Sequence, residues 1–77
     1  MNLKYTVAFF TEDVVDGMPD NIHCIKEYSA PTPLPIPTAG ATVLIEGELY
    51  NDKYTVIEYP EDGDYEFMTE VYVEVAR

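Results

Sequence analysis

The sequence has little of what several classes of protein require. It contains one cysteine, Cys24, so no disulfide forms within the chain and no cluster of thiolates can hold zinc. Only four of its 77 residues are Lys or Arg, against fifteen Asp or Glu, which gives a formal net charge of −11. A surface this acidic repels phosphate backbones and anionic membrane surfaces. We therefore expect neither direct nucleic-acid binding nor membrane binding.

Long hydrophobic runs are also missing. The apolar stretch at residues 3–10 is interrupted by Lys4 and Thr6 and is followed by two acids. It is too short to cross a bilayer or to form the core of a signal peptide with its cleavage site. Because a lone cysteine also suits a reducing compartment, the sequence predicts a cytoplasmic protein.

The chain nevertheless has enough apolar residues to fold. They make up 47% of the composition and include seven Tyr and three Phe, far more than a disordered acidic tail contains. A chain of this length buries only about 60% of the surface that its unfolded form exposes. We expect one domain, residues 1–77, without room for a deep active-site cleft.

Five segments have the composition or the alternation of β-strands. In the first, Leu3, Tyr5, Val7 and Phe9 alternate with more polar or smaller residues, which predicts one face turned to the core. Residues 11–21 contain the turn formers Asp16-Gly17 and Pro19-Asp20 and are predicted to be a loop with room for one helical turn. The predicted strands are residues 2–10, residues 22–28, a strand that begins at Val43, one that ends near Tyr59, and residues 65–75.

The segment 31–40 is rich in proline, with every second residue from 31 to 37 a Pro. Because proline lacks a backbone donor and restricts the residue before it, this segment is neither a helix nor a central strand. We expect an extended connector that leaves Leu34 and Ile36 free to pack onto the domain. Docking of the prolines into an aromatic groove of a partner is less favoured, since no Lys or Arg flanks them.

Two positions compete for the turn after the third strand, Glu46-Gly47 and Asn51-Asp52, and the sequence does not choose between them. The clearest hairpin turn is residues 60–64. These features predict an all-β fold, a small antiparallel meander or an SH3-like barrel of about five strands, with the proline-rich connector before the third.

The segments 37–47, 54–57 and 71–75 resemble small, uncharacterised SH3-like β-barrel proteins of bacteria and phages. The resemblance covers roughly the second half of the chain. It implies a fold, and it carries no functional residues across.

Catalytic and metal-binding patterns are sparse. His23 and Cys24 are adjacent, and neighbours in a strand point to opposite faces, so they are not expected to form an activated pair. We expect Cys24 in the core and His23 at the surface. The acids at residues 61–64 lack the ligand spacing of an EF-hand loop and are interpreted as a solvated turn. The prediction is a protein that is not an enzyme and has no metal site and no cofactor.

The last strand carries the candidate binding surface. Val71, Val73 and Val75 are predicted to face one side, and Glu66, Glu70 and Glu74 recur on the opposite side about 13 Å apart in an extended chain. Met68 and Tyr72 share that side and add contact area for a partner. The remaining candidate residues are acids that would extend the negative surface: Glu46, Glu48, Glu58, Asp62 and Asp64.

This pattern predicts a non-enzymatic, acidic protein-binding module whose partner has a basic surface. In a more specific form, the chain is a phage or mobile-element inhibitor that occludes the nucleic-acid-binding surface of a host defence protein. Three alternatives stay open. The acids can simply keep a small β protein soluble and protect its sheet edges. The chain can be an assembly subunit that forms a homo-oligomer through sheet edges, or a small-molecule sponge with its site at a subunit interface.

Overall fold

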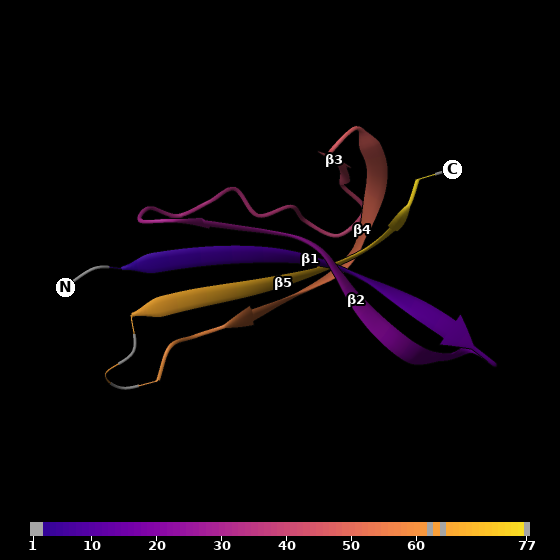
Figure 1. Cartoon of the computed structure of the whole chain (residues 1–77), viewed down its shortest axis with the longest axis horizontal. Helices are drawn as coiled ribbons and strands as arrows, with labels where there is room; N and C mark the ends of the chain where they lie inside the picture. Colours follow the sequence, from indigo (N-terminus) through magenta and orange to yellow (C-terminus); the bar gives the residue numbers. More distant parts are fainter. Residues whose placement is uncertain (1–2, 62, 64, 77) are drawn as a thin grey trace.

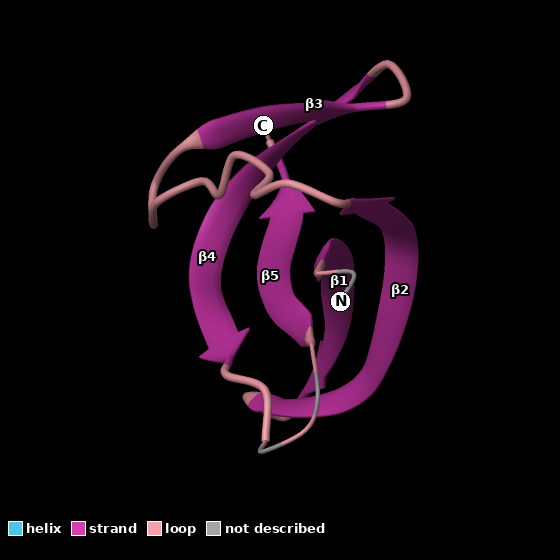
Figure 2. Ribbon diagram, turned by 90° about the vertical axis from the view of Figure 1, so that its left-hand side faces the viewer, coloured by secondary structure: helices cyan, strands magenta, loops and turns pink. Residues whose placement is uncertain are grey.

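The protein is a single curled β-sheet. The computed structural model describes residues 3–61, 63 and 65–76. Its strands are β1 (Lys4–Val15), β2 (Met18–Ala30), β3 (Thr42–Ile45), β4 (Glu48–Glu58) and β5 (Glu66–Val75). They lie in the order β2-β1-β5-β4-β3 and curl into a half-barrel (Figures 1 and 2). The prediction of a small, barrel-like all-β fold of about five strands, with a proline-rich connector before the third, is confirmed.

The sheet is mixed and not the antiparallel meander that the sequence offered as one form of the fold, because its first and last strands pair in parallel at its centre. β1 pairs antiparallel with β2 and parallel with β5, while β5 pairs antiparallel with β4 and β4 with β3. The predicted last strand is therefore flanked on both sides by other strands. The edges of the sheet are β2 and β3. A central position holds the backbone of β5 in two ladders of hydrogen bonds, which makes it a rigid support for its side chains.

The prediction of a loop at residues 11–21 is wrong. β1 continues to Val15 and β2 begins at Met18, so only Asp16 and Gly17 form the turn. Their φ angles are 53° and 79°, in the left-handed region. Two-residue turns with positive φ match the twist of the flanking strands, and Asp-Gly is a favoured sequence for them. The turn residues were recognised from the sequence, but they join two long strands.

The second tight turn is at Glu46 and Gly47, with φ angles of 49° and 84°. This settles the choice that the sequence left open, because Asn51 and Asp52 lie inside β4. The predicted hairpin turn at residues 60–64 connects β4 to β5, and residues 62 and 64 lie outside the described part of the chain.

The core lies on the concave side of the sheet. Its buried members are Val7 and Phe9 of β1, Ile45 of β3, and Val71 and Val73 of β5. Ile25, Leu34, Val43 and Tyr50 pack against them and are partly buried. The proline-rich connector has no regular secondary structure and covers this side through Leu34. The inner faces predicted from alternation in the first and last strands are the faces that meet here.

The prediction that Cys24 is a core residue is wrong, whereas His23 is exposed as predicted. Cys24 is a free, exposed thiol whose Sγ lies 3.8 Å from the carbonyl oxygen of Lys26. It pairs with Phe10, on the face of the sheet opposite the core. Because β2 is an edge strand, no further strand shields that position.

Within the described residues, no helix has the length and apolar character needed to span a membrane.

Candidate binding surface

The outer face of the sheet, opposite the core, carries the predicted residues of β5. Val71 and Val73 are buried on the inner face, so Met68, Glu70 and Tyr72 project to the outer face. Glu66 and Glu74 follow the same alternation and are exposed. Since β5 is central, neighbouring strands extend this surface on both sides.

An aromatic row crosses the outer face. It consists of Phe10 of β1, Tyr72 of β5 and Tyr54 of β4, which are paired side by side in the sheet. The ring centroids of Phe10 and Tyr72 are 5.5 Å apart, and those of Tyr72 and Tyr54 are 4.5 Å apart, both in stacked geometry. Stacked cross-strand aromatic pairs add to sheet stability and keep each ring in one orientation. The row is a rigid apolar surface on an acidic protein.

Carboxylates contact both tyrosines of the aromatic row. The Tyr54 hydroxyl donates a hydrogen bond to Glu12 Oε1, and the Tyr72 hydroxyl donates one to Glu70 Oε2 at 3.0 Å. The hydrogen bond to Glu12, with partial desolvation and the charge of Glu12, raises the pKa of Tyr54 from 10.0 to about 12. The pKa of Tyr72 is also raised. The largest cause is desolvation by burial, followed by the hydrogen bond to Glu70 and its charge. Both hydroxyls are therefore neutral donors at physiological pH, held by negative neighbours.

This arrangement predicts an alkaline titration that identifies Tyr54. Its hydroxyl donates to Glu12 only while protonated, so the contribution of that hydrogen bond to stability is complete below pH 10 and is lost as the pH rises from 10 toward about 12. NMR of the tyrosine ring carbons is expected to show Tyr54 ionising near pH 12. Glu12→Ala is expected to bring its pKa back toward 10, whereas Glu27→Ala, on β2, is the control and leaves it unchanged. Ionisation of Tyr54 near pH 10 in the unmodified protein would contradict the hydrogen bond.

The predicted site residues do not all belong to one surface. Glu58 pairs with Met68 in the sheet and belongs to the outer face. Glu66 lies at the end of that face, where its carboxylate is 4.0 Å from Lys4 Nζ and accepts a hydrogen bond from Thr6 at 3.4 Å. Asp62 and Asp64 lie outside the described residues.

Glu46 and Glu48 are separated from the aromatic row. Glu46 is in the turn between β3 and β4, and its carboxylate is 2.7 Å from Lys26 Nζ of β2. This hydrogen-bonded pair lowers the pKa of Glu46 and raises that of Lys26. The pair links the β3–β4 turn to the opposite edge strand across the open side of the half-barrel. Glu48 is exposed at the start of β4, beside this turn. Glu46 and Glu48 therefore lie apart from the acids of β5.

Sequence reasoning missed three residues of this surface: Phe10, Glu12 and Tyr54. Phe10 lies at the end of the predicted first strand, but nothing in the local sequence places it beside Tyr72. Glu12 was assigned to a loop. Tyr54 became a neighbour of Tyr72 only through the register of β4 and β5.

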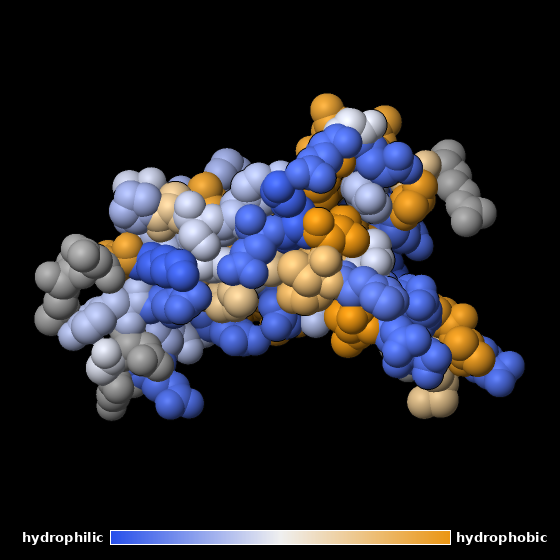
Figure 3. Space-filling view, in the orientation of Figure 1, coloured by the Kyte–Doolittle hydropathy of each residue, from blue (hydrophilic) through white to orange (hydrophobic). Residues whose placement is uncertain are grey.

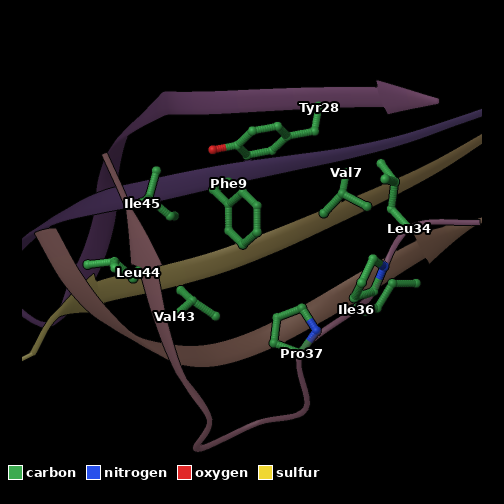
Figure 4. A pocket seen from close by; sticks show the side chains of 10 residues that line it. Val7, Phe9, Tyr28, Leu34, Ile36, Pro37, Val43, Leu44 and Ile45 are labelled. Atoms are coloured by element: carbon green, nitrogen blue, oxygen red, sulfur yellow. The ribbon is translucent and has the colours of Figure 1, made fainter. Parts of the chain in front are cut away.

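A second candidate site is an apolar pocket on the concave side, with a volume of about 440 Å³. It opens between β1, β2, β3 and the proline-rich connector, and the ring of Phe9 points into it (Figure 4). Tyr28 packs edge-on against Phe9 with ring centroids 6.1 Å apart. The full lining is Val7, Phe9, Tyr28, Leu34, Pro35, Ile36, Pro37, Val43, Leu44 and Ile45. This pocket offers apolar contact, but its lining contains no acid or base.

The residues with catalytic potential are apart from both sites. His23 Nε2 is 3.1 Å from Asp13 Oδ2, an exposed pair in the β1–β2 hairpin. In the described part of the chain, no three His, Cys, Asp or Glu side chains are grouped so as to hold a metal ion. A comparison of the chain with protein-family models, curated proteins and solved structures finds no match. The functional argument therefore rests on the surface itself.

Proposed function

We propose that the protein is a non-enzymatic binding module whose outer face associates with a basic surface of a partner protein. The observation that carries the proposal is the aromatic row of Phe10, Tyr72 and Tyr54, held in place beside the carboxylates of Glu12 and Glu70. Rigid aromatic side chains supply contact area at a low cost in conformational entropy. The neighbouring carboxylates supply charge complementarity, which accelerates association and selects basic partners.

The distribution of lysines supports this choice of face. Lys4 lies beside Glu66, at one end of the outer face, and Lys26 is paired with Glu46 on the other side of the sheet. These two cations offset acids that are distant from the aromatic row. Lys53 precedes Tyr54 in β4 and adds one positive charge near the row. The four carboxylates of Glu12, Glu58, Glu70 and Glu74 outnumber it, so the field there is negative and favours a cationic partner.

In its more specific form, the proposal makes the chain an inhibitor from a phage or mobile element that occludes a nucleic-acid-binding groove of a defence protein. The support is the spacing of Glu66, Glu70 and Glu74 along one face of a central strand, about 13 Å between successive carboxylates. Along the duplex axis one strand presents a phosphate about every 3.4 Å, so that spacing corresponds to about four phosphate intervals. Because β5 has neighbours on both sides, this spacing is held rigidly.

The test uses a short peptide of alternating arginine and glycine as the probe, titrated into the protein and followed by NMR of the backbone amides. We expect binding that weakens as salt rises, with the largest shifts at the aromatic row. Reversing both acids that flank Tyr72, Glu70→Lys with Glu74→Lys, is expected to weaken binding about tenfold, equivalent to about 1.4 kcal/mol.

The matched control reverses two exposed acids away from the row, Glu48→Lys with Glu61→Lys, so the change in net charge is the same. We expect it to weaken binding less than about threefold, because only the long-range field changes. Circular dichroism verifies that each variant keeps the sheet. Equal losses in the two variants would show that net charge alone governs binding. No binding at low salt, together with a mass above that of the monomer, would instead favour the homo-oligomer.

A further inference from the structure

The far half of the β1–β2 hairpin extends beyond the body of the sheet. β5 pairs with β1 only as far as Phe10, so from Thr11 onward β1 has a single neighbour, β2. We call residues 11–24 the arm. It projects away from the core at the end of the molecule where β1 and β2 turn (Figure 1). A two-stranded ribbon without a third strand or a covering helix has no core of its own.

The arm exposes large apolar side chains. Val14, Val15 and Ile22 are more than half exposed, and Met18, beside the turn, is 70% exposed. Apolar side chains gather where the hairpin ends in the space-filling view (Figure 3). Clustered exposed apolar side chains on a protruding element are characteristic of contact surfaces. Their exposure here follows from the topology, since no other strand reaches them.

Charge of one sign surrounds these apolar side chains. The sequence from residue 5 to residue 25 contains no Lys and no Arg, and the acids of the arm are Glu12, Asp13, Asp16 and Asp20. The single histidine of the arm, His23, is paired with Asp13. The arm therefore combines an apolar tip with a uniformly acidic surround.

The combination of exposed apolar side chains and negative charge limits which kind of partner can bind the arm. A second copy of the chain would bring acidic arms against each other, and anionic membranes or nucleic acids would meet the same repulsion. A protein groove with an apolar floor and basic rims complements both properties. Glu12 belongs to the arm and also accepts the hydrogen bond of Tyr54, so the arm is continuous with the aromatic row.

We propose that the arm is a docking element that inserts its apolar tip into a basic-rimmed groove of the partner protein. The inference rests on the proposed function for the basic partner, and it adds a second contact surface with a different chemical basis. The outer face contributes stacked aromatic rings and carboxylates. The arm contributes apolar side chains, and one of them is the unbranched side chain of Met18, which can adapt to an irregular groove.

The test compares two peptides of equal positive charge, one alternating lysine with leucine and one alternating lysine with serine. We expect the lysine–leucine peptide to bind more tightly and to shift the amides of the arm. The double variant Met18→Ser with Val15→Ser is expected to lower the affinity for the lysine–leucine peptide about fivefold and to leave the affinity for the lysine–serine peptide unchanged. Both side chains are exposed, so neither substitution removes core packing.

Leu44→Ser is the matched control, since Leu44 is 68% exposed but lies on β3 and lines the concave pocket. It is expected to leave both affinities unchanged. If Leu44→Ser lowers the affinity for the lysine–leucine peptide and the double variant of Met18 and Val15 does not, the peptide makes its apolar contact in the pocket and the inference is wrong. Shifts confined to the aromatic row would overturn the role of the arm while leaving the proposed function in place. Shifts confined to the arm would leave the role of the arm in place and would overturn the proposed function of the outer face. A concentration-dependent dimer that Met18→Ser disrupts would make a second copy the occupant and also overturn the inference.

Discussion

Replacing Phe9 with alanine is expected to lower the free energy of unfolding by about 3–5 kcal/mol, the usual cost of removing a buried phenylalanine ring. The Phe9 side chain is only 8% exposed, lies in the core with Val7 and Val71, and packs edge-on against Tyr28. Because the whole stability of a small domain is about 5–15 kcal/mol, and a chain this short lies toward the lower end, this loss removes much of it. Urea denaturation followed by far-ultraviolet circular dichroism measures the change.

The adjacent residue provides the control. Phe10 has the same side chain but points to the outer face, where it is half-buried and stacks on Tyr72. Phe10→Ala loses one stacked pair and part of its buried area, so we expect a loss of about 1–2 kcal/mol. Comparable losses for Phe9→Ala and Phe10→Ala would mean that the two faces of β1 are not as distinct as the structure has them.

The sequence predicts which residues face the core because that information is local. Alternation with a period of two placed Val7 and Phe9 on one side of the first strand and Val71 and Val73 on one side of the last. All four are buried in one cluster. The proline-rich connector and the existence of five strands are likewise recognisable from neighbouring residues alone, whereas the full length of the first two strands is not.

The candidate site was only partly predictable because strand neighbours are set by long-range packing. Periodicity shows which face a residue occupies, but it does not show which strand lies alongside. The aromatic row unites Phe10, Tyr54 and Tyr72 from three strands, through the parallel pairing of β1 with β5 and the antiparallel pairing of β4 with β5. Of these three residues the sequence alone indicates only Tyr72, from its place among the acids of the last strand.

The arm escaped prediction for a different physical reason. Alternation arises when one side of a strand faces a core and the other faces water. From Thr11 onward β1 has no third strand beside it, so neither side is an interior. Acids and valines therefore follow one another without a period, as in Glu12 to Val15, and the segment resembles a loop in sequence. Its turn residues, Asp16 and Gly17, were the one local signal of a hairpin.

The proline-rich connector leads to the second large expected effect. Leu34 is partly buried and packs against the core, and it lines the concave pocket as well as a smaller pocket next to it. Prolines at 31, 33, 35 and 37 remove backbone donors, so the connector depends on side-chain contacts until its end, where the Gly40 N–H donates to the Asp52 carbonyl at 2.9 Å. Leu34→Ala is expected to lower the free energy of unfolding by about 2 kcal/mol, the lower end of the range for a leucine because the side chain is only partly buried.

Ile36 is the matched comparison, since it also stands between two prolines but is 44% exposed. Ile36→Ala is expected to cost less than about 1 kcal/mol, in proportion to the smaller area that it withdraws from water. Urea denaturation of the two variants in parallel gives the difference directly. If Ile36→Ala proves the more damaging, the connector is held through the rim of the concave pocket and not through the core. If neither variant loses stability, the side chains of Leu34 and Ile36 cover the concave side without fastening the connector to it.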